Sequence, residues 1–191
     1  MFDLEAFIGE CRRLAQAQHG PSRILDLMRE AVGDAEAVKR AVTPLDPKVG
    51  VLDAPPLFRS AELTVLNLTL RPGIVSIAHD HRMWAVIGIY EGQENNTFFR
   101  RSGRGLDKAG ERQVRAGDAI LLGPEVVHAI ENPLATQTLG LHVYGGDFFA
   151  AQRSMWSPHD GGERPYDIPQ FGAWSRDLAK SRRAATDASA P

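Results

Sequence analysis

Residues 73–92 read GIVSIAHDHRMWAVIGIYEG, and the pair His79 and His81 within this stretch decides how the fold is interpreted. Side chains two residues apart on a β-strand point to the same face of a sheet. The pattern therefore places two imidazoles side by side and sends Asp80 to the other face. With a third imidazole from a neighbouring strand, they would form a three-nitrogen site for a first-row metal ion. Taken alone, the pair is equally compatible with two solvated or hydrogen-bonded histidines.

A second stretch supplies the third imidazole. Gly117 is followed by ten residues, His128, three residues and Asn132. Together with the glycine, His-x-His and later glycine of residues 73–92, this order and spacing resembles the two motifs of the cupin superfamily. The resemblance covers residues 57–156. It implies a small barrel in which His79, His81 and His128 share one metal ion.

The predicted fold is an all-β core, a cupin double-stranded β-helix (jelly-roll) barrel, with an N-terminal helical segment. We expect N-terminal helices packed on the barrel in residues 1–44, the barrel in 45–174 and a disordered tail in 175–191. Apolar residues at helical spacing predict the first helix, and alternating apolar residues predict strands. The predicted helices are 2–18, 23–32 with Ser22 as N-cap, and a third from Asp34; the predicted strands are 63–70, 74–78, 84–90, 96–101, 119–122, 126–131 and 136–144.

The first motif departs from the usual cupin pattern at one ligand. Cupins usually carry a glutamate ligand four or five residues after the second histidine, and here those positions are Ala85 and Val86. The site is thus predicted to contain three neutral imidazoles and an open coordination face, as a catalytic metal needs. We expect Fe(2+), with Zn, Mn or Ni as alternatives, because imidazole suits several of these ions.

Three histidines without the glutamate are similar to the thiol dioxygenases, which include cysteine dioxygenase and 3-mercaptopropionate dioxygenase. The resemblance implies catalytic roles for His142 and Tyr144, although Gly140 replaces the serine of the family's Ser-x-His-x-Tyr run. It also implies that Arg153, and a second arginine, Arg59, bind the substrate carboxylate, for which a planar guanidinium is suited. A core tyrosine, a structural histidine and two surface arginines are the alternative interpretations.

The predicted activity is iron-dependent oxidation of a small carboxylate-bearing thiol by O2 to a sulfinic acid. A more local resemblance points to an uncharacterised bacterial branch of metal-dependent cupins. Two other classes stay open at this point: a non-redox Zn, Mn or Ni cupin isomerase, lyase or hydrolase, and a small-molecule-binding cupin. We expect a small-molecule thiol and O2 as partners, and a homodimer is compatible with the family.

Composition and charge argue against several other classes of function. The 191 residues carry a formal net charge of -2, which favours neither nucleic acid nor an anionic membrane as a partner. No basic and apolar leader begins the sequence, and no apolar run is long enough for a membrane span. The single cysteine, Cys11, cannot form an internal disulfide. We therefore expect a cytoplasmic protein of one domain.

Overall fold

The protein is represented by a computed structural model that describes residues 1–42, 55–103 and 105–188. Within these ranges the helices are α1 (Leu4–Ala15), α2 (Gly20–Val32), α3 (Ala35–Ala41) and α4 (Ile168–Ala188). No helix in the described part of the chain combines the length and apolar character needed to cross a membrane. The predicted boundary between residues 44 and 45 lies outside the described residues.

The N-terminal helices begin at residues that cap them. Asp3 accepts a hydrogen bond from the backbone N–H of Ala6 at 3.0 Å, which satisfies one of the free donors at the start of α1. Asp34 caps α3 in the same way, as predicted. The prediction of Ser22 as the N-cap of α2 is wrong, because the helix already begins at Gly20 and takes proline in its first turn.

Strands make up most of the remaining described chain. They are β1 (Phe58–Arg59), β2 (Thr64–Leu70), β3 (His79–Asp80), β4 (Ala85–Glu91), β5 (Gln93–Ser102), β6 (Gly105–Arg115), β7 (Ala119–Leu122), β8 (Val127–Glu131), β9 (Thr138–Tyr144), β10 (Ser154–Trp156) and β11 (Glu163–Pro165). The predicted strand 74–78 is present only as an isolated bridge between Val75 and Glu131.

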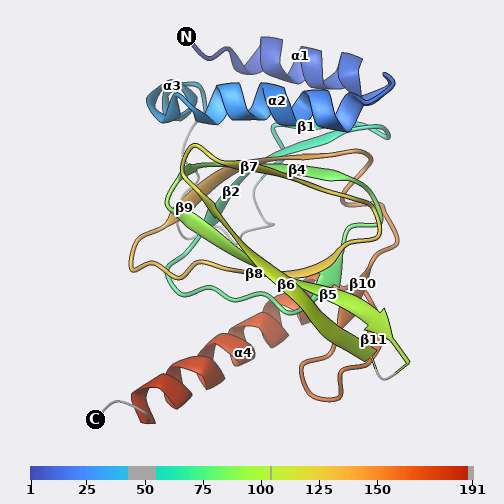
Figure 1. The fold of residues 1–191 in the computed structure, drawn as a ribbon, viewed down its shortest axis with the longest axis vertical. Coiled ribbons are helices and arrows are strands. Elements are labelled where there is room, and N and C mark those ends of the chain that lie inside the picture. The colour runs from blue at the N-terminus through green and yellow to red at the C-terminus, as the bar shows by residue number, and fades with distance from the viewer. Residues whose placement is uncertain (43–54, 104, 189–191) are drawn as a thin grey trace.

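In the described residues these strands form two antiparallel sheets. The five-stranded sheet has the order β1-β2-β9-β4-β7, and the six-stranded sheet has the order β11-β10-β3-β8-β5-β6. The sheets face each other across a barrel interior (Figure 1). Several neighbouring strands in each sheet are distant in sequence, as in β3 beside β8 and β9 beside β4. This is the predicted double-stranded β-helix barrel, and the fold class is confirmed.

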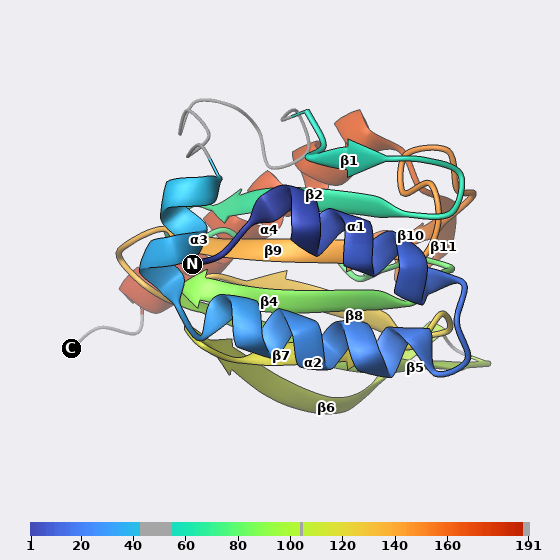
Figure 2. The same ribbon diagram turned by 90° about the horizontal axis from the view of Figure 1, so that it is seen from above.

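Helices α1 and α2 cover the outer face of the five-stranded sheet (Figures 1 and 2). Phe7, Cys11 and Leu14 form the buried stripe of α1, and they join a core cluster that includes residues of β2, β4 and β9. Gly88 in β4 permits close approach of α2, because a Cβ there would lie 2.5 Å from Met28. The N-terminal helices are therefore packed on the barrel.

The C-terminal segment differs from the disordered tail predicted for residues 175–191. Helix α4 continues to Ala188 and lies on the opposite side of the barrel from α1 and α2 (Figure 1). Ser175 is buried and accepts a hydrogen bond from the backbone N–H of Ile77. The polar composition that suggested disorder is that of a helix with a narrow contact face and a wide exposed one.

Candidate metal and substrate site

The three predicted ligands come together at the inner face of the six-stranded sheet, with two of them on its strands and His81 directly after β3. His79 in β3 and His128 in β8 are direct partners in the antiparallel register, so their side chains lie on the same face. His81 follows two residues after His79 and joins them. All three side chains are buried, and their candidate ligand atoms lie within 4.8 Å of one another. We call these three residues the triad.

In two of the triad residues a hydrogen bond engages Nδ1, which leaves Nε2 available as a metal ligand. His79 Nδ1 lies 3.1 Å from the Ile77 carbonyl oxygen, which can only accept, so Nδ1 carries the proton and Nε2 is bare. His128 Nδ1 lies 2.8 Å from Asn96 Oδ1 and is oriented in the same way. His128 Nε2 is 3.3 Å from His81 Nε2. Ring nitrogens this close together are suited to bind one metal ion with their lone pairs.

Burial keeps the triad uncharged. Loss of hydration lowers the pKa of His79 to about 4 and those of His81 and His128 well below the usual value, and the neighbouring Arg153 charge lowers the first two further. Neutral imidazole is the form that binds a metal. Among the described residues, no carboxylate belongs to this group of ligands. The triad thus suits a dipositive ion with coordination positions left open, and Fe, Zn, Mn and Ni all accept such ligands.

Asp80 faces away from the triad, as its position between the two histidines predicts. Its carboxylate is fully buried, forms ion pairs with Arg82 and Arg101, and accepts a hydrogen bond from the backbone N–H of Ser154. These contacts tie β3 to β5 and to β10. They hold β3 at its outer face, while His79 on the same strand points to the barrel interior.

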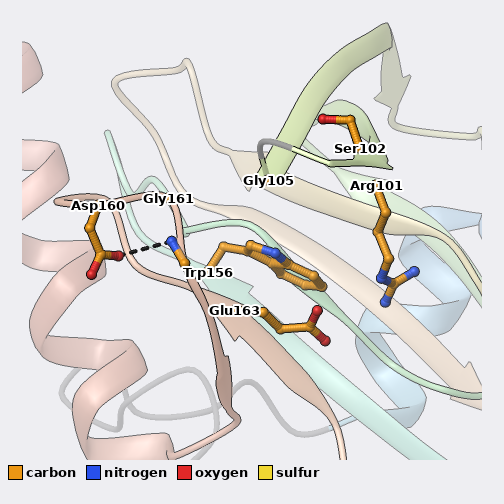
Figure 3. A pocket seen from close by; sticks show the side chains of 8 residues that line it. Arg101, Ser102, Gly105, Trp156, Asp160, Gly161 and Glu163 are labelled. Carbon is orange, nitrogen blue, oxygen red and sulfur yellow. Dashed lines mark hydrogen bonds between the residues drawn. The ribbon is translucent and has the colours of Figure 1, made fainter.

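A surface pocket lies on the Asp80 side of the strand rather than at the triad. Arg101 stacks over the Trp156 ring at 5.1 Å and lies at one wall of this pocket (Figure 3). The lining residues are Arg101, Ser102, Gly105, Trp156, Asp160, Gly161, Gly162 and Glu163. The pocket is therefore separate from the metal chemistry.

His142 and Tyr144 reach the triad from the five-stranded sheet. Both belong to β9 and are buried, with His142 Nδ1 3.2 Å from the Tyr144 hydroxyl. The Tyr144 ring lies 5.1 Å from the His81 ring, nearly perpendicular to it. The structure thus brings together the two side chains predicted as catalytic and one predicted ligand.

Arg153 is buried in the same region. Its guanidinium carbon lies 3.9 Å from the ring centroids of both Phe148 and Tyr166, so the cation is sandwiched between two aromatic faces. The Phe148 ring is 5.9 Å from the His81 ring, and the Tyr166 ring is 6.3 Å from the His79 ring. Arg153 Nε and Nη1 have no hydrogen-bond partner among the described residues.

Arg59 does not join this group, and its predicted role in substrate binding does not fit its position. Its guanidinium lies at the surface, where it makes two hydrogen bonds of 2.9 and 3.0 Å to the Asp147 carboxylate and stacks over Phe149. The side chain is 46% exposed. Asp147 occupies the donors that a substrate carboxylate would need. Arg82 is likewise at the surface, paired with Asp80 and Glu163.

Several residues near the triad were not predicted. Phe171 of α4 packs 5.1 Å from the His79 ring and 5.0 Å from Tyr166, so the C-terminal segment covers the site. Asn96 holds His128, and Glu94 lies beside Asn96. Their spacing of two, which places both side chains on one face of β5, was a signal in the sequence. The positions of Tyr166 and Phe171 depend on the path of the chain after β10.

Comparison with known proteins adds the following. A scan of the sequence against known protein families finds no match. Among solved structures, a double-stranded β-helix protein from Klebsiella pneumoniae is similar, with 15% identity and a TM-score of 0.47 over 62% of this chain and 87% of that chain.

Two enzymes are also similar in structure. A Bacillus subtilis oxalate decarboxylase variant has 23% identity and a TM-score of 0.40, covering 48% of this chain and 23% of that chain. A DMSP lyase from Ruegeria pomeroyi has 17% identity and a TM-score of 0.41, covering 52% of this chain and 46% of that chain. This chain thus spans less than half the length of either enzyme.

Proposed function

We propose that this protein is a metal-dependent dioxygenase that oxidises a small carboxylate-bearing thiol, of the 3-mercaptopropionate or cysteine type, to a sulfinic acid. The observation that carries the proposal is Arg153, a buried cation beside the triad with two nitrogens that lack partners. A buried charge with two nitrogens left without partners is costly, so a site of this kind is suited to an anionic group that arrives with the substrate.

His79, His81 and His128 would hold the ion, for which Fe(II) is proposed. When bound, iron supplies the reaction with dioxygen and favours the thiolate form of a coordinated thiol. The overall reaction is balanced without another reductant: the thiol sulfur loses four electrons, O2 gains them, and both oxygen atoms end on sulfur.

The surrounding side chains have separable tasks in this proposal. Arg153 binds the substrate carboxylate by charge-assisted hydrogen bonds and so orients the thiol toward the triad. The Tyr144 ring packs against His81, and His142 Nδ1, 3.2 Å from the Tyr144 hydroxyl, orients that hydroxyl in this proposal. Phe148 and Phe171 exclude water from the space around these groups.

Oxygen uptake by iron-loaded protein tests the proposal directly. We expect uptake with 3-mercaptopropionate or cysteine and much less with cysteamine, which has a thiol but no carboxylate. Sulfinic acid should be formed in a ratio of one to each O2 consumed. Absence of thiol-dependent uptake with all three compounds would contradict the proposal. If zinc, manganese or nickel copurifies at full occupancy instead, the result favours the non-redox class.

Substitution of Arg153 tests the carboxylate site. In Arg153→Met we expect the KM for the carboxylate-bearing thiol to rise by about 10- to 100-fold, the equivalent of one hydrogen-bonded charge pair. The rate with cysteamine should stay as low as in the unmodified protein. Arg59→Met is the matched control, because its guanidinium lies at the surface with Asp147. Equal effects of the two substitutions would contradict the assignment.

A further inference from the structure

Glu94 is a carboxyl group enclosed in the barrel interior. It lies on β5 with no exposed surface. Its Oε1 accepts a hydrogen bond of 2.9 Å from Asn96 Nδ2, while its Oε2 has no partner among the described residues. Burial raises the pKa of Glu94 to about 7. A buried carboxyl group without a cationic partner is expected to serve a specific purpose, because its burial costs free energy.

The contacts of Glu94 extend in two directions. On one side, Asn96 Oδ1 lies 2.8 Å from Nδ1 of the triad residue His128. On the other side, Glu94 Oε2 is 4.0 Å from His142 Nε2, which also lacks a hydrogen-bond partner in the described chain. His142 Nδ1 in turn faces the Tyr144 hydroxyl at 3.2 Å. These polar groups cross the barrel from one sheet to the other.

The hydrogen-bonding direction along this path is fixed at the His128 end. Because Nε2 of His128 points toward the metal position, its Nδ1 donates to Asn96 Oδ1, and the Asn96 amide then donates to Glu94 Oε1. Oε1 is therefore the carbonyl-like oxygen of the acid. A proton on Glu94 belongs on Oε2, the oxygen that faces His142.

Gly140 keeps the facing edge of His142 accessible. A Cβ at this position would lie 3.2 Å from His142 Nε2 and 2.9 Å from Ile89 Cδ1. A serine side chain at Gly140 would thus crowd the ring that Glu94 approaches. Gly140 on β9 and Glu94 on β5 therefore both lie next to His142 Nε2.

We propose that Glu94 is a positioning residue that donates a hydrogen bond from its acid form to His142 Nε2, directly or through one water molecule, and so sets the tautomer of His142. The imidazole then carries its proton on Nδ1 and donates to the Tyr144 oxygen. The Tyr144 hydroxyl proton remains available for the substrate side. A shift of about 1 Å, or one bridging water, closes the 4.0 Å separation.

The effect of Glu94 on catalysis rests on the proposed function. The tautomer of His142 can be measured without turnover. Glutamine is the decisive replacement, because its carbonyl oxygen accepts from Asn96 and its amide donates to His142, as the protonated acid does. Leucine fills the same space in the barrel interior and cannot donate. Glu62→Gln is a control at an exposed glutamate.

The experiment is ¹H–¹⁵N correlation spectroscopy on zinc-loaded protein labelled with ¹⁵N-histidine, with zinc as a diamagnetic probe. We expect the Nδ1–H tautomer of His142 in the unmodified protein and in Glu94→Gln, and its loss in Glu94→Leu. An Nε2–H tautomer in the unmodified protein, or the same tautomer in all three proteins, would overturn the proposal. Zinc content in each sample verifies that the triad is intact.

Turnover gives an independent readout with iron-loaded protein. We expect Glu94→Leu to lower kcat by about 10- to 100-fold with little change in KM, the loss of one oriented proton donor. The groups facing Glu94 are His142 and Tyr144 of β9 and, through Asn96, His128 of β8. The unmodified protein should lose activity as pH rises through about 7, because the acid form disappears, whereas Glu94→Gln should not.

The outcomes separate the two proposals. If the unmodified protein oxidises no thiol but its His142 tautomer depends on Glu94, the proposed function fails and the positioning role stands. If thiols are oxidised and Glu94→Gln behaves like Glu94→Leu in both measurements, the positioning role fails and the function stands.

Discussion

The six-stranded sheet carries His79 and His128 of the triad, with His81 directly after β3, whereas the five-stranded sheet carries His142 and Tyr144. The two sheets also differ in how they are supported. In the five-stranded sheet, β2, β4 and β9 each have seven residues, and their outer face is covered by α1 and α2. In the six-stranded sheet, β3 has two residues and is held by single contacts such as those of Asp80.

This difference indicates a division of tasks. Long strands backed by a core hold the hydrogen-bonding pair in place independently of the metal. The ligands lie on or directly after the short strands β3 and β8, where a bound ion would add support to the fold. Substitutions in the six-stranded sheet should therefore change metal binding, and those in β9 should change turnover with the metal retained.

The largest effect is expected for His81→Ala. Loss of a hydrogen-bond partner of a ligand lowers metal affinity by roughly 10- to 100-fold. Removal of one of the three imidazole ligands should lower it further, by well over about 100-fold. Metal content per chain after purification measures this. His142→Phe is the control in the other sheet and should retain the metal. Full occupancy in His81→Ala would remove the distinction between the sheets.

The stability of the metal-free protein should fall in acid. Burial lowers the pKa of His79 to about 4 and that of His142 to about 3, and it lowers those of His81 and His128 well below the ordinary value of 6.5. Below pH 6.5 the unfolded chain binds protons that the folded protein does not, so each histidine removes roughly 1.4 kcal/mol of stability per pH unit until its folded-state pKa is reached. Glu94 opposes this with the reverse sign between pH 7 and 4.5.

Four histidines outweigh one carboxyl group, so the free energy of unfolding should be several kcal/mol lower at pH 5.5 than at pH 7. Urea unfolding of metal-free protein at the two pH values measures the difference. In His142→Phe the difference should shrink by roughly one third, because one of the four histidine contributions is gone while the opposing contribution of Glu94 remains. Equal stability at both pH values would show that these imidazoles are solvated.

Tyr144→Phe should separate turnover from metal binding. The ring that packs against His81 and Phe148 is retained, and only the hydroxyl is lost. We expect thiol-dependent oxygen uptake to fall by about 100-fold, the usual contribution of one positioned proton donor. Metal content should not change. A loss of metal in this variant would show that β9 also supports the ligands.

Asn96→Ala should have a smaller effect on the ligand sheet. Loss of the hydrogen bond to His128 is expected to weaken metal binding by about 10- to 100-fold, measured by competition with a chelator. Asn95→Ala is a matched control, because the neighbouring side chain points to the opposite face and bonds to Gln93. Identical affinities in the two variants would exclude orientation of His128 by Asn96.

The smallest effect is expected for Arg59→Ala. This residue forms a surface ion pair with Asp147 at the edge of the five-stranded sheet. The free energy of unfolding should change by less than about 1 kcal/mol, as for most exposed pairs. Metal content and the KM for thiols should be unchanged. An increase in KM comparable with that of Arg153→Met would restore Arg59 to the substrate site.

The parts of the fold that could be predicted are those whose side chains repeat a burial pattern. The stripe of Phe7, Cys11 and Leu14 predicted α1, and the strand 119–122 was predicted with the bounds of β7. Strand β6 was not predicted, because seven of its eleven residues are exposed and it is stabilised by its pairing with β5. Helix α4 was not predicted because few of its residues contact the barrel.

The site shows the same contrast. The triad could be predicted because a two-residue spacing on a strand fixes the relative direction of two imidazoles. The position of Arg59 could not, since the sequence does not reveal that Asp147 lies beside it. Glu94 and Tyr166 escaped prediction because their meaning depends on tertiary neighbours, His142 for one and Arg153 for the other.

The residues that cover the site come late in the chain. Arg153, Tyr166 and Phe171 all follow the last ligand, His128, and the last strand of the five-stranded sheet. Because synthesis proceeds from the N-terminus, the triad emerges from the ribosome before its cover is made. Loading of an ion on the growing chain needs no opening of the protein, whereas in the finished protein Phe171 packs against His79, so we expect later exchange to be slower. The order of residues along the chain thus favours early capture of an ion and slow release.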